Sequence, residues 1–141
     1  MVWRGQAEKS LKIGWIGPLT GPVRLLGAEN ERAIRMAIDE HNQAGRVWVE
    51  FLVEDDQYQA ERSVAAYKKL RDWGAKVVFL NTYSAMFEVA EMARKDKVVI
   101  VNSIDDDREL GRLEGQVFLV AKETEDLAQM LAEDMLRSGR E

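Results

Sequence analysis

Short apolar segments alternate with amphipathic segments along almost the whole chain, and this alternation constrains the fold more than any other feature. Five runs rich in Val, Ile, Leu and Phe are typical of buried β-strands, at residues 11–17, 47–53, 76–80, 98–101 and 117–120. Helical periodicity follows the first three strands, from 28 to the glycine at 45, from about 60 to 73, and from 85 to 94. A last helix is expected from about 124 to 137, whereas the charged segment 103–116 is typical of a loop.

The strands are apolar almost throughout instead of alternating, which is typical of a parallel sheet covered by helices on both faces. We therefore predict a doubly wound, flavodoxin-like α/β fold with strand order 2-1-3-4-5. In such a sheet the crevice that receives a ligand lies at the carboxyl ends of strands one and three. The segment 19–27, with its Gly-Pro pair, is predicted to be the loop at the first of these ends.

Charge and composition exclude several classes of partner. The 141 residues carry a formal net charge of -5, and no stripe of Lys and Arg is present, which argues against nucleic acid and anionic membrane surfaces. Cysteine is absent, so thiolate metal sites and disulfides are excluded. No apolar run approaches the ~20 residues of a membrane span. Residues 1–10 lack the apolar core of a signal peptide, so we expect that any export signal has been removed.

Catalytic and cofactor motifs are not found. The Gly-rich stretch 12–22 is neither G-x-G-x-x-G nor a Walker loop, so nucleotide phosphates are not expected there. The acidic corner Glu54-Asp55-Asp56 has no EF-hand spacing, and it follows the second strand, whereas a phosphoacceptor receiver domain has its acidic pair after the first. His41 has no nucleophile placed beside it by any motif. We predict no enzyme, no cofactor and no metal site.

Three motifs resemble type I periplasmic binding proteins for branched-chain amino acids and amides. The first is the loop Gly-Pro-Leu-Thr-Gly-Pro at 17–22, and the second is the helix end Ala-Ile-Asp-Glu-His-Asn-Gln-Ala-Gly at 37–45. The third is the corner Val-Glu-Asp-Asp at 53–56, followed by a helix with Ser-Val-Ala-Ala at 63–66. The resemblance implies a polar tail at 1–10, an N-terminal ligand-binding lobe at 11–120, and a crossover with a final helix at 121–141. The chain would then be the first lobe of a two-lobed receptor.

The resemblance also implies ligand contacts in three loops. The first falls on Leu25 or Leu26, just before the first helix. The second is the segment of Tyr83, Ser84 and Ala85, where a hydroxyl and nearby N–H groups at a helix N-terminus suit a carboxylate; Ser84 is equally well interpreted as an N-cap. The third includes Ser103 and Asp105. There the adjacent carboxylates of 105–107 depart from the family pattern, and we expect them to face solvent.

The predicted function is extracytoplasmic or periplasmic binding of a small solute, such as an amino acid or amide, by hinge closure between two lobes. The full-length parent would deliver the solute to an ABC importer in the membrane or act as a receptor sensor. The alternative is a non-catalytic, flavodoxin-like interaction module that binds no small ligand and forms homodimers.

Overall fold

The computed structural model describes residues 10–45, 47–104, 109–113, 115, 117–120 and 124–139. Five parallel strands form one sheet in the order β2-β1-β3-β4-β5, as predicted. The strands are β1 (Ser10–Gly17), β2 (Trp48–Asp55), β3 (Val77–Leu80), β4 (Val99–Asn102) and β5 (Val117–Leu119). The helices are α1 (Arg24–Gln43), α2 (Ala60–Trp73), α3 (Met86–Asp96) and α4 (Thr124–Ser138), with short 3-10 turns η1 (Tyr83–Ala85) and η2 (Leu110–Leu113).

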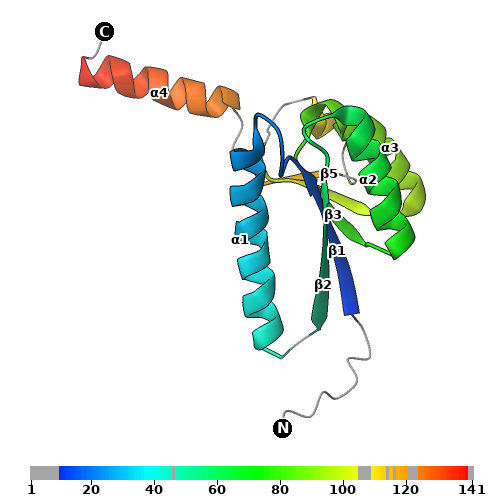
Figure 1. Ribbon diagram of the computed structural model, residues 1–141. Coiled ribbons are helices and arrows are strands. Elements are labelled where there is room, and N and C mark those ends of the chain that lie inside the picture. The colour runs from blue at the N-terminus through cyan, green and yellow to red at the C-terminus, as the bar shows by residue number, and fades with distance from the viewer. Residues whose placement is uncertain are drawn as a thin grey trace.

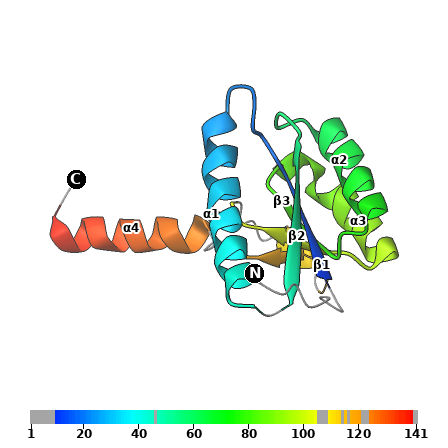
Figure 2. The same cartoon turned by 60° about the horizontal axis from the view of Figure 1, so that its bottom comes forward.

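The helices cover the two faces of the sheet unequally. Figure 1 and Figure 2 show α1 alone on one face, and α2 with α3 on the other. Right-handed crossovers explain this division, because the chain moves outward from β1 to β2 and then returns across β1 to β3, which carries α2 to the opposite face. Helix α4 extends away from the sheet in both views.

The main hydrophobic core lies between the sheet and the α2–α3 layer. Its fully buried side chains come from alternate positions of the central strands and from the inner faces of the two helices; they include Ile16, Val78, Leu80, Ile100, Tyr67, Leu70, Met86 and Val89. The Tyr67 hydroxyl donates to Asp96 Oδ2 at 3.0 Å and ties α2 to α3. Burial, followed by this hydrogen bond, raises the pKa of Tyr67, so the phenol remains protonated.

Helix α1 starts earlier than predicted, and few of its residues are buried. It begins at Arg24, inside the segment predicted as a loop, because its first turn packs directly on the chain leaving β1. Only Gly27 and Ile38 are buried on this helix, and Ile34 is half-buried. Described side chains do not cover the flank of α1 that carries Ala33 and Ala37, and both are exposed.

Candidate ligand-binding site

The carboxyl ends of β1, β3 and β4 lie side by side at one edge of the sheet, the upper edge in Figure 1. Helix α1 and the η1–α3 segment both begin at this edge. Neither helix start has a side-chain cap: the N-cap residues are Val23 for α1 and Thr82 for η1. The Arg24, Leu26 and Ala85 N–H groups donate to the carbonyls of Gly21, Val23 and Thr82. Within the described residues the Leu25 and Ser84 N–H groups have no such partner, so this edge offers them as hydrogen-bond donors to an anion.

The loop after β1 is held by one carboxylate. Asp55 Oδ1 accepts the Leu19 N–H at 2.9 Å and the Thr20 N–H at 3.3 Å, and Asp55 Oδ2 accepts the Thr20 hydroxyl at 2.5 Å. Burial of Asp55 alone would raise its pKa, but the Thr20 hydroxyl and three backbone N–H groups outweigh it, and the pKa of Asp55 lies below its ordinary value. Asp55 is therefore ionised at neutral pH, and both of its oxygens accept hydrogen bonds from the protein.

The segment after β3 exposes the predicted serine. Ser84 is exposed in the middle of η1, Tyr83 is half-buried and Ala85 is buried. Ser84 does not cap a helix here, since the N-cap of η1 is Thr82 and that of α3 is Ala85. The Ala85 N–H donates to the Thr82 carbonyl at 3.2 Å. Within the described residues the Ser84 hydroxyl has no hydrogen-bond partner, so it is free to meet a ligand.

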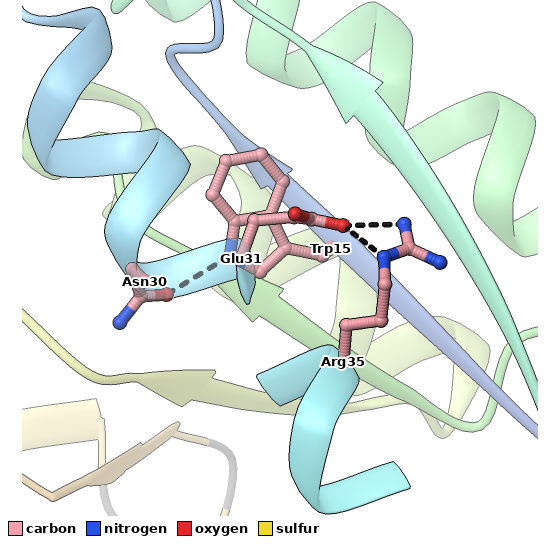
Figure 3. Close-up of polar contacts among 4 residues, drawn as sticks. All are labelled: Trp15, Asn30, Glu31 and Arg35. Atoms are coloured by element: carbon pink, nitrogen blue, oxygen red, sulfur yellow. Dashed lines mark hydrogen bonds and ion pairs between the residues drawn. The ribbon is translucent and has the colours of Figure 1, made fainter. Parts of the chain in front are cut away.

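The segment after β4 joins a cluster of polar side chains beneath α1. Asn30 Oδ1 accepts the Trp15 indole N–H at 3.0 Å and the Asn81 amide N–H at 2.9 Å. Asn30 Nδ2 donates to Ser103 Oγ at 2.8 Å, and the Ser103 hydroxyl lies 3.2 Å from Asn81 Oδ1. One helix residue thus links three strand ends. Figure 3 shows Asn30 turned toward the Trp15 indole, beside the Glu31–Arg35 ion pair of the same helix.

The remaining predicted site residues fall at different places. Leu25 and Leu26 lie within the first turn of α1, with 70% and 49% of their surface exposed. Ser103 is half-buried, and its hydroxyl is engaged by Asn30 and Asn81. Asp105, with its neighbours 106 and 107, lies outside the described residues.

Sequence reasoning missed the residues that hold this edge together. Asn30 is a polar side chain on the inward stripe of α1, one turn before Ile34 and two turns before Ile38, and that interruption of an apolar stripe was the available signal. Thr82 gave no comparable signal. Its hydroxyl is buried and donates to Asp56 Oδ2 at 2.5 Å, a contact between segments 26 residues apart in the sequence.

Two negative findings concern the described residues only. They contain no group of three or more His, Cys, Asp or Glu side chains that could hold a metal ion. None of their helices is long and apolar enough to cross a membrane.

Comparison with known families decides what this architecture is. The profile of the family described as periplasmic binding protein matches residues 10–140. The chain belongs to this family. The resemblance drawn from the three motifs is thereby confirmed, and the family is one of solute-binding proteins located outside the cytoplasm.

Individual proteins that resemble this chain are also solute-binding proteins. The leucine-, isoleucine-, valine-, threonine-, and alanine-binding protein of Pseudomonas aeruginosa is 31% identical over 98 residues, which is 67% of this chain and 26% of that protein. A branched-chain amino acid transporter substrate binding protein from Streptococcus pneumoniae, solved with isoleucine, has a TM-score of 0.75 at 18% identity, over 82% of this chain and 34% of its own. A solute binding protein from R. palustris, solved with benzoate, has a TM-score of 0.77 at 18% identity, over 93% and 38%.

These coverages define the extent of the match. The chain spans about a quarter of the curated relative and just over a third of the two solved structures. The structural matches establish the α/β fold, and their partial coverage corresponds to the first lobe.

Proposed function

We propose that the chain forms the first wall of an extracytoplasmic cleft that binds a small carboxylate, an amino acid or an aromatic acid. The observation that carries the proposal is the sheet edge at which two helices begin without side-chain caps and at which the Ser84 hydroxyl is exposed, with no partner among the described residues. Oriented N–H groups and a hydroxyl donor at a helix start are suited to a carboxylate. The relatives solved with isoleucine and benzoate bind ligands of this class.

In this proposal the cleft closes by rotation of a second lobe about a hinge, and the closed protein delivers its solute to an ABC importer or signals through a receptor. Leu25 and Leu26 supply exposed apolar surface at the same edge for the ligand's side chain. Ser103 supports the wall through Asn30 and Asn81. One wall alone leaves the ligand partly solvated, so we expect millimolar rather than micromolar affinity for this chain.

A thermal-shift screen with isoleucine, leucine, threonine, benzoate and a cationic control, putrescine, tests the proposal. A probe at ~100 times its dissociation constant stabilises the folded chain by about 2.7 kcal/mol, which gives a measurable rise in Tm. The expected result is a response to carboxylates and none to putrescine. A chain that responds to no carboxylate at saturating concentration would refute carboxylate binding by this wall.

Ser84→Ala tests the site itself. Loss of a hydroxyl donor to a charged ligand is expected to weaken carboxylate binding by about 1–3 kcal/mol, measured by isothermal titration. Ser138→Ala, which changes an exposed serine of α4, is the matched control and should bind as tightly as the unmodified chain. Equal affinities of the two variants would remove Ser84 from the site.

A second candidate function, an interaction module that binds other proteins or a second copy, is favoured by exposed apolar side chains outside this edge. Phe118 on β5 and Leu131 and Leu136 on α4 expose 53%, 64% and 85% of their surface. Apolar surface of this kind often marks a protein interface. The test is the molar mass in solution. A mass that rises with protein concentration and does not respond to carboxylates would favour this second function. The double substitution Leu131→Glu with Leu136→Glu should then lower that mass.

A further inference from the structure

Two adjacent carboxylates connect the two loops of the candidate binding edge. Asp55 accepts the hydroxyl and N–H of Thr20 in the loop after β1. Asp56, which is fully buried, accepts the hydroxyl of Thr82, the residue immediately before η1, at 2.5 Å. A single peptide bond separates the two carboxylate-bearing residues, so the positions of Thr20 and Thr82 are fixed relative to each other through β2.

The turn that follows holds both carboxylates in place. Gln57 and Tyr58 have φ values of 53° and 61°, in the left-handed region that non-glycine residues rarely adopt. Asp55 Oδ1 accepts the Gln57 N–H at 3.0 Å, and Asp56 Oδ1 accepts the Tyr58 N–H at 2.8 Å. The Asp56 N–H donates to the Gly17 carbonyl at 3.1 Å, which anchors the turn to the end of β1. Two successive left-handed residues persist because these bonds outweigh their cost.

Thr82 stands at a helix start, but its hydroxyl bonds Asp56 and makes no cap bond there. A threonine at the N-cap ordinarily accepts a hydrogen bond from an N–H group of the first turn. Here the hydroxyl donates to Asp56 Oδ2, and no side-chain cap bond forms at η1. The Thr82 side chain therefore occupies no first-turn N–H group, although the Thr82 carbonyl accepts the Ala85 N–H at 3.2 Å.

We propose that Asp55 and Asp56 are positioning residues of the binding edge: through Thr20 and Thr82 they hold the two loops in the arrangement that the ligand requires, before the ligand arrives. The inference rests on the proposed function, because it assigns these loops to the ligand. A preorganised wall avoids the free-energy cost of ordering its loops on binding. That saving matters most for a wall that contacts the ligand on one side only.

The structure offers a matched pair of variants to separate positioning from general stability. The Ser63 hydroxyl also donates to Asp56 Oδ2, at 2.6 Å, but Ser63 lies on α2 and not in a binding loop. Thr82→Val and Ser63→Ala each remove one donor from the same carboxylate oxygen. Thr82→Ser retains the hydroxyl and serves as the rescue variant.

Hydrogen–deuterium exchange of the ligand-free, full chain is the primary measurement. Thr82→Val is expected to speed exchange about tenfold at Ala85, whose N–H donates to the Thr82 carbonyl, and to leave 63–70 of α2 protected. Tenfold is about the effect of losing one hydrogen bond to a carboxylate. Thr82→Ser should restore the original rate at Ala85, and Ser63→Ala should leave it unchanged. Equal acceleration of Ala85 exchange by Ser63→Ala, or none by Thr82→Val, would overturn the proposal.

Titration with isoleucine then connects positioning to binding. The expected result is a dissociation constant raised about tenfold by Thr82→Val, unchanged by Ser63→Ala and restored by Thr82→Ser. If isoleucine fails to bind even the unmodified chain, carboxylate binding is refuted for that probe, and the exchange data still decide whether the carboxylates order the loops. If isoleucine binds and Thr82→Val changes exchange but not affinity, the carboxylates order the loops without serving the ligand, and the proposal fails.

Discussion

At the scale of single residues, Gly27 determines how closely α1 approaches the strand that precedes it. A Cβ atom built on this glycine would lie 1.9 Å from the Pro18 carbonyl oxygen and 2.7 Å from its carbonyl carbon. The obstruction is backbone, which cannot rotate aside as the end of a side chain can. The close approach brings the first turn of α1, with Leu25 and Leu26, to the candidate site.

Gly27→Ala is expected to destabilise the fold although alanine is the better helix former. The helical preference of alanine over glycine contributes about 1 kcal/mol in favour of the variant. Overpacking against fixed backbone costs about 1–3 kcal/mol and more when atoms must separate by over an ångström, so the net effect is a loss of about 2 kcal/mol. Urea unfolding measures it, with Glu29→Ala at an exposed position of the same turn as control. A variant as stable as the control would mean that α1 can move outward without cost.

At the scale of elements, the corner after β2 makes the loop after β1 sensitive to acid. The pKa of Asp55 lies below its ordinary value of 3.8, because hydrogen bonds from Thr20, Leu19 and Gln57 outweigh the effect of burial. A carboxylate with a lowered pKa contributes stability that is complete above the unfolded-state value and is lost as pH falls through the folded-state value. The loss is therefore expected below about pH 3.8 and not near neutrality.

Asp55→Asn measures this contribution directly. At pH 7 the variant should be less stable by about 1 kcal/mol, since the amide is a poorer acceptor for four donors. The difference in unfolding free energy between the two proteins should remain constant down to about pH 5 and shrink below pH 3.8. Glu40→Gln, an exposed change on α1, should show no such trend. A difference that persists unchanged at low pH would mean that the Asp55 charge does not hold the loop.

Helices and strands whose local pattern agrees with their burial were predictable from the sequence. Contacts between residues far apart in the sequence were not. The strand order and the bounds of α2 follow from apolar runs and from Gly74, which adopts the left-handed conformation expected at a helix C-cap. The early start of α1 depends on Gly27 packing against Pro18, which no periodicity reveals. The roles of Asn30 and Thr82 depend on partners 51 and 26 residues away, Asn81 and Asp56.

At the scale of the whole molecule, the lobe and α4 differ in how far their side chains are buried. Residues of the core are buried between the sheet and the α2–α3 layer. By contrast, all the described side chains of α4, from residue 128 onward, are exposed, including the apolar Met130, Leu131 and Met135. The apolar periodicity of α4 correctly predicted a helix, but periodicity cannot show whether a partner surface lies within the same chain.

Removal of residues 121–141 is therefore expected to leave the lobe folded with almost the same stability. Removal of exposed side chains typically changes the free energy of unfolding by less than about 0.5 kcal/mol, which corresponds to a Tm shift of a few degrees in a domain of this size. Differential scanning calorimetry of the full chain and of residues 1–120 compares the two, and circular dichroism checks that both retain the same sheet. A Tm lowered by ten degrees or more would show that α4 packs on the lobe in solution. If that loss grows with protein concentration, the packing is between copies; if it is independent of concentration, α4 folds back on its own sheet.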